Sequence, residues 1–131
     1  MNNKAYEYAK KSIHLKEVPK YVKKQCREFI NIADGKSDKY YLDEEKIKQI
    51  ENVLKLLIMP KGLKAGKPLY DCTCDYQWLL YISILAIVHR DNPSKRKYEP
   101  AILEIARKNF KTYTIATLFI LLFLFFINLL P

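Results

Sequence analysis

The apolar residues of this chain are concentrated near its end, and this distribution limits the folds that are open to it. Between residues 115 and 130, only Thr117 and Asn128 interrupt an apolar run. As a helix, this run spans about 24 Å, which is less than the roughly 30 Å hydrocarbon core of a bilayer. The run therefore fits a helix that is buried on most faces in a protein core, or a short membrane span.

The rest of the chain is polar and rich in lysine, and at 131 residues the whole is at most one ordinary domain. Counting Lys and Arg against Asp and Glu divides the net charge of +9 into +5 over residues 1–41, −1 over 42–60, +3 over 61–99 and +2 over 100–131. Because the excess is spread along the chain, it suits contact with a nucleic acid or an anionic membrane but specifies neither.

The cysteine pattern indicates reduced thiols. Cys26, Cys72 and Cys74 form an odd set without framework spacing, and the first thirty residues are charged throughout, unlike a secretory signal. We therefore expect a cytosolic setting. A tetrahedral zinc site needs four ligands, and His14 and His89 offer no paired spacing beside these thiols.

Apolar periodicity predicts helices over most of the first ninety residues. We expect them over residues 5–15, 19–33, 43–59 and 75–89. Pro19 suits the first turn of the second helix, and Gly35 suits a stop after it. Acidic residues 43–45 complement the dipole of the third helix. Its expected buried face consists of Ile47, Ile50, Val53, Leu54, Leu57 and Ile58.

The pattern changes after Pro100. Residues 101–106 suit a short buried strand, 107–109 a polar turn, and the run from Lys111 a helix. A strand, a polar loop, a Lys-Thr pair and a helix follow one another in this order in a phosphate-binding loop. Such a loop uses backbone N–H groups and a helix N-terminus for phosphates, the Lys for the β and γ phosphates and the hydroxyl for Mg²⁺.

The glycines of the usual phosphate-loop pattern are replaced here by Ile105 and Phe110. Residues 104–112, Glu-Ile-Ala-Arg-Lys-Asn-Phe-Lys-Thr, nevertheless closely resemble the deviant Walker A loop of phage terminase large subunits. That loop commonly reads apolar residue, Ala, Arg, Lys, Asn, Gly, Lys, Ser or Thr. Phe110 is the one departure, and because a bulky residue there needs an accommodating backbone, we expect weak nucleotide binding.

Two further segments resemble the same family. Residues 61–68, Lys-Gly-Leu-Lys-Ala-Gly-Lys-Pro, are similar to the loop before its adenine-contact region. Residues 75–78, Asp-Tyr-Gln-Trp, stand where the family has a Trp-Gln pair at a helix start, with Tyr76 in place of the Trp. Residues 21–29 resemble the family's leading helix, and the whole resemblance covers roughly residues 18–124.

The resemblance implies a mostly α fold, with a helical amino-terminal region over residues 1–72. Residues 73–131 would then hold the first strand and helix of a P-loop α/β ATPase domain. ATP and Mg²⁺ are the implied cofactors, and Thr112 would reach the Mg²⁺ through the nucleotide. The implied nucleotide-binding residues are Gln77, which would read the adenine edge, and Arg107, Lys108, Asn109, Lys111 and Thr112 of the loop.

For the intact family, the resemblance implies an ATP-driven motor and endonuclease that packages viral DNA in the host cytoplasm. Its implied partners are double-stranded DNA, the terminase small subunit and the portal protein. Residues 125–131 do not resemble what usually follows, so we expect a truncated member that lacks Walker B and the nuclease acids. Metal-assisted cleavage needs clustered carboxylates, and Glu104 stands alone, so we assign no catalytic residue.

The alternative interpretation is a small tail-anchored membrane protein. Residues 113–130 would form its single span, and Arg107, Lys108 and Lys111 before that span would keep the basic, helical amino-terminal part in the cytoplasm.

Overall fold

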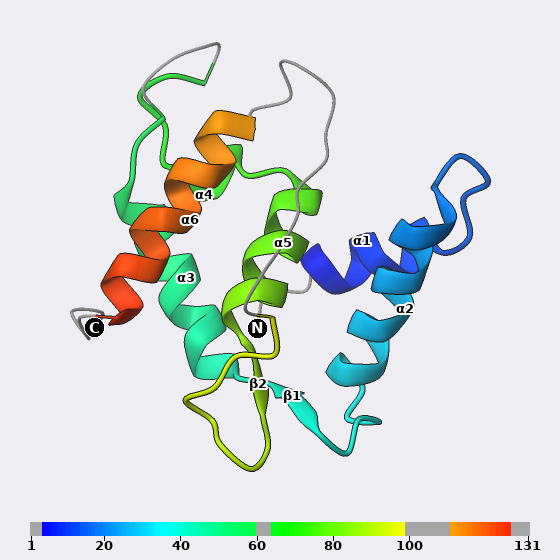
Figure 1. Cartoon of the computed structure of the whole chain (residues 1–131). Helices are drawn as coiled ribbons and strands as arrows, with labels where there is room; N and C mark the ends of the chain where they lie inside the picture. Colours follow the sequence, from blue (N-terminus) through cyan, green and yellow to red (C-terminus); the bar gives the residue numbers. More distant parts are fainter. Residues whose placement is uncertain (1–3, 60–63, 99–110, 127–131) are drawn as a thin grey trace.

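The computed structural model describes residues 4–59, 64–98 and 111–126, and within these ranges the chain is mostly helical, as predicted (Figure 1). The expected strand at 101–106 and the loop at 107–109 lie outside the described residues. The elements in chain order are α1 (Lys4–Ser12), α2 (Lys20–Ala33), β1 (Tyr40–Leu42), α3 (Glu44–Leu56), α4 (Leu69–Cys72), α5 (Asp75–Leu85), β2 (Ile87–His89) and α6 (Lys111–Phe126).

Helices α1 and α2 form a hairpin, and α1 also packs against α5 (Figure 1). Helix α1 ends at Ser12, three residues before its predicted end. Pro19 stands at the N-cap of α2, and its fixed φ of −60° directs the chain into the first turn. Gly35 follows α2 with φ of +76°, a left-handed conformation that favours glycine, and so confirms the predicted stop.

Helix α3 begins where the acidic residues predict. The carboxylate of Asp43 accepts hydrogen bonds from the backbone N–H groups of Glu45, at 3.1 Å, and Lys46, at 3.4 Å. Four residues of the predicted face are buried: Ile47, Ile50, Val53 and Leu54. The prediction for Ile58 was wrong. Leu57 is already extended, so Ile58 leaves the helix face, pairs in an isolated bridge with Pro68 and is 61% exposed.

The predicted helix over residues 75–89 is too long. Helix α5 ends at Leu85, and residues 87–89 form strand β2, which pairs antiparallel with β1 in the register Tyr41 to Val88. Ile87 and Val88 are β-branched and buried, which favours a strand. Residues 87–89 form a strand and do not extend the helix, because they pair with a strand more than forty residues earlier in the sequence.

The core is centred on α5, which packs against α1, α3, α6 and β2. Its apolar side chains belong to one cluster with residues of α1, α2, α3 and α6. Trp78 of α5 is fully buried, and its ring meets that of Tyr70 in α4 edge to face at 5.4 Å. This core draws residues from both 1–72 and 73–131, and the division of the chain into two domains stays a prediction.

Helix α6 is described from Lys111 to Phe126 and is a helix, as the apolar run predicts; it lies along the side of the molecule opposite the α1–α2 hairpin (Figure 1). Thr114, Thr117 and Leu121 are buried, at 0%, 7% and 0% exposure. Phe119 and Phe123, in contrast, are 68% and 63% exposed. Over the described ranges, α6 included, no helix combines the length and the apolar content that crossing a membrane requires.

Candidate nucleotide-binding site

The start of α5 is held by the side chain of Gln77, the residue expected to read adenine. Its amide oxygen accepts a hydrogen bond from the backbone N–H of Cys74, at 2.8 Å. Cys74 is the N-cap of α5, and Gln77 is the third residue of the helix. This bond satisfies one backbone donor that the helix itself leaves without a partner.

The other end of the same amide reaches α6. The Nε2 of Gln77 donates a hydrogen bond to the hydroxyl of Thr114, at 2.7 Å. Both side chains are buried, Gln77 at 6% and Thr114 at 0% exposure. A buried polar group without a partner is costly, so this bond constrains the two helices to stay together. It joins α5 to the first turns of α6 across 37 residues of sequence.

Two tyrosines of α5 extend this polar contact. The hydroxyl of Tyr81 forms hydrogen bonds with those of Thr117 and Thr114. Burial raises the pKa of Tyr81 to about 12, although the bonds to the two threonines act to lower it. Burial also raises the pKa of Tyr76, and its bond with Thr114 lowers it. Both tyrosines therefore stay neutral near pH 7, and the contact is an uncharged network inside the protein.

The first turn of α6 is the described part of the expected phosphate loop. Lys111 is the first residue of the helix, and Thr112, the second, is exposed. First-turn N–H groups have no intrahelical acceptor and carry the positive end of the helix dipole, which suits an anion. The exposed Thr112 hydroxyl is thus compatible with the predicted contact to nucleotide-bound Mg²⁺.

Of the six predicted nucleotide-binding residues, the structure describes Gln77, Lys111 and Thr112. Gln77 lies beside the turn that follows Lys111 and Thr112. Arg107, Lys108 and Asn109 fall outside the described residues. Because both polar ends of the Gln77 amide already have partners, contact with adenine would use its second N–H or displace Thr114. The nucleotide roles of all six residues stay predictions.

The cysteines and the acidic residues provide no metal centre within the ranges that the structure describes. There, no group of three or more His, Cys, Asp or Glu side chains is placed to share an ion. Cys26 is fully buried, and burial raises the pKa of its thiol while a hydrogen bond with Ser12 lowers it. Cys72 is the last residue of α4, Cys74 is the N-cap of α5, and both are free thiols.

Sequence reasoning missed Thr114, Thr117 and Tyr81. A signal was present, because Thr114 and Thr117 stand three residues apart, on one face of an otherwise apolar helix. Polar residues placed so in an apolar helix indicate a buried polar contact with a neighbouring element.

Comparison of the chain with models of known families, with curated proteins and with solved structures found no match.

Proposed function

We propose that this chain carries the amino-terminal part of a phage terminase large subunit, with an ATP-binding loop at the start of α6. Three segments support the proposal, because they occur in the order in which the family has them: 61–68, 75–78 and 104–112. Each segment matches its counterpart over only a few residues. Their order along one chain is more specific than any one of them.

The observation that carries the proposal is the 2.7 Å hydrogen bond between Gln77 and Thr114. The resemblance assigns Gln77 to the adenine and Lys111 and Thr112 to the phosphates. A single nucleotide can engage both sets only if the starts of α5 and α6 are neighbours. The bond joins the starts of α5 and α6. No local feature of the sequence predicts this contact.

In the proposed site, Lys111 contacts the β and γ phosphates and Thr112 contacts the Mg²⁺ bound to them. Arg107, Lys108 and Asn109 complete the loop around the phosphates, and Gln77 lies on the adenine side. ATP would supply the free energy by which the intact family member moves double-stranded DNA into a procapsid. The terminase small subunit and the portal protein are its proposed partners in that process.

A titration of the chain with a fluorescent ATP analogue in the presence of Mg²⁺ tests this proposal. We expect weak binding that Lys111→Ala reduces roughly tenfold or more, because a charge-assisted bond to phosphate is removed. Lys48→Ala is the matched control, since Lys48 is an exposed lysine on α3. Affinity that is the same in both variants and the parent chain would show that this loop does not hold the nucleotide.

A further inference from the structure

One face of α2 is lined with positive charge. Lys20, Lys23, Lys24 and Arg27 follow one another at i, i+3, i+4 and i+7, which places them on the same side of the helix. Three of the four are exposed and Lys23 is half-buried. The apolar face of the same helix, with Cys26 and Phe29, is turned into the core. The basic face is therefore directed to solvent.

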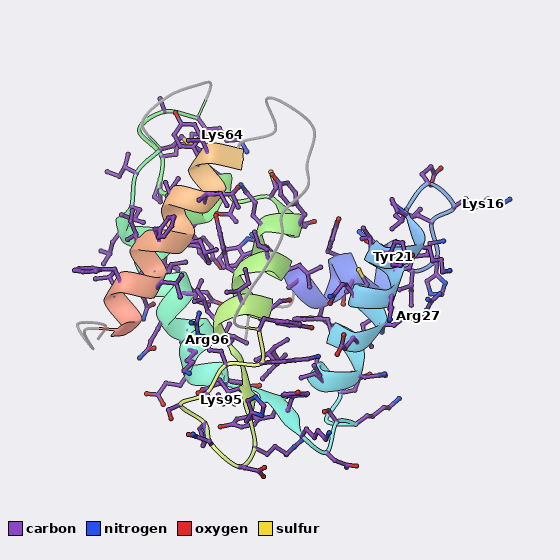
Figure 2. The ribbon with its side chains drawn as sticks, in the orientation of Figure 1. Lys16, Tyr21, Arg27, Lys64, Lys95 and Arg96 are labelled. Carbon is purple, nitrogen blue, oxygen red and sulfur yellow. The ribbon has the colours of Figure 1, made fainter. Side chains whose placement is uncertain are left out.

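Further basic residues come from the rest of the same hairpin. Over residues 10–27 the chain has seven Lys and Arg against one acid, Glu17, a net charge of +6. Lys10 and Lys11 come from the end of α1, and Lys16 from the turn that joins the two helices. Figure 2 shows Lys16, Tyr21 and Arg27 on this hairpin, well away from α6. We call the exposed basic residues of 10–27 the hairpin surface.

The four cations on α2 have no acidic partner among the residues that the structure describes. Within the described parts of the chain, none of them takes part in an ion pair. Like charges at i, i+3 and i, i+4 destabilise a helix by a few tenths of a kcal/mol per pair. The first turn of α2 has no acid and its N-cap, Pro19, provides no side-chain bond, so Lys20 stands unopposed at the positive end of the dipole. A bound polyanion would relieve both effects.

An exposed aromatic ring lies among these cations. Tyr21 is 75% exposed, and the Nζ of Lys20 lies 5.8 Å from the centre of its ring. An aromatic ring that stands in solvent beside lysines is the usual arrangement for stacking on an unpaired base. The Tyr21 ring is not part of the core, because α2 buries its apolar residues on another face.

We propose that the hairpin surface binds nucleic acid through its phosphate backbone. The stripe from Lys20 to Arg27 is about 10 Å long, and a duplex presents about one phosphate charge per 1.7 Å of its axis, so all four cations find phosphates. An anionic membrane is the less suitable partner, because a helix that lies on a bilayer needs a broad exposed apolar face. The proposal is independent of the nucleotide loop on α6.

The test measures fluorescence anisotropy of the full chain with a labelled duplex of 20 base pairs and a single strand of the same length, over a series of salt concentrations. The variant combines Lys20→Gln, Lys24→Gln and Arg27→Gln. The control combines Lys36→Gln, Lys39→Gln and Lys48→Gln, three exposed lysines outside the surface with the same change in net charge. Circular dichroism verifies that both variants keep the helical fold.

We expect the hairpin variant to lower duplex affinity at least tenfold and to reduce the slope of log K against log salt by about 2 to 3, since each phosphate contact contributes about 0.9. The control should change neither quantity appreciably. Tyr21→Ala should weaken single-strand binding roughly fivefold or more and spare the duplex. Equal losses in both triple variants, or no binding to either nucleic acid at low salt, would overturn the proposal.

Discussion

At the scale of single residues, the side chain of Gln77 is held at both ends of its amide. Its amide bonds the exposed N-cap residue Cys74 at one end and the buried Thr114 at the other. Sequence reasoning identified Gln77 correctly as a residue at the start of a helix. It could not show that the side chain is buried, because the partner that buries it is 37 residues later in the chain.

Replacing Gln77 with Ala should lower the free energy of unfolding by about 1 to 3 kcal/mol, because the buried Thr114 hydroxyl loses one of its hydrogen bonds and the N-cap N–H of Cys74 loses its acceptor. Urea titration measures the change. Asn31→Ala is the matched control: Asn31 is an exposed side-chain amide on α2, and its loss should stay within about 0.5 kcal/mol. Equal effects of the two substitutions would contradict the role of Gln77 as a buried link between α5 and α6.

At the scale of elements, the sequence predicted best where local signals decide. The Asp43 cap and the left-handed Gly35 act within a few residues of the ends that they define, and both ends were confirmed. The helix over the apolar run of α6 was predicted as well. The short sheet of β1 and β2 was not predicted. Residues 40–42 and 87–89 become strands because they pair with each other, which no local window contains.

The packing of α6 also depends on distant residues, and it separates two kinds of apolar side chain on one helix. Leu121 is fully buried against the core, while Phe119 and Phe123 line an open hollow of about 990 Å³ with Asp43 and Lys46. The uniform apolar composition of this segment indicates burial on most faces. Among the described residues, the side toward α5 fulfils that expectation and the side that carries the two phenylalanines does not.

Truncating Leu121 tests whether α6 is part of the core. Leu121→Ala should lower the free energy of unfolding by about 2 to 5 kcal/mol, because it leaves a cavity between α6 and the rest of the core. Leu56→Ala provides the matched comparison, since Leu56 is 76% exposed at the end of α3 and its removal should change stability by about 0.5 kcal/mol or less. Similar values for the two variants, measured by urea unfolding, would mean that α6 does not pack as described.

At the scale of the whole molecule, the proposed nucleotide site and the hairpin surface lie far from each other in the described structure. Lys111 and Thr112 of the proposed nucleotide site belong to α6, which lies on the side of the molecule opposite the hairpin surface (Figure 1). Counted along the sequence in large blocks, the positive charge is spread over most of the chain. Helical geometry gathers part of it on one surface, because residues three and four apart in α2 share a face. Counting the charges at helical spacing therefore predicts this surface from the sequence, whereas counting them in blocks does not.

In the proposed site, one nucleotide contacts residues 106–112 and the start of α5 together. Hydrogen exchange of the full chain, with and without millimolar ATP and Mg²⁺, tests it most directly. Protection should increase over residues 106–112 and at the start of α5, should vanish in Lys111→Ala, and should persist in Lys48→Ala. Unchanged exchange over residues 106–112, or protection there that survives Lys111→Ala, would contradict the claim.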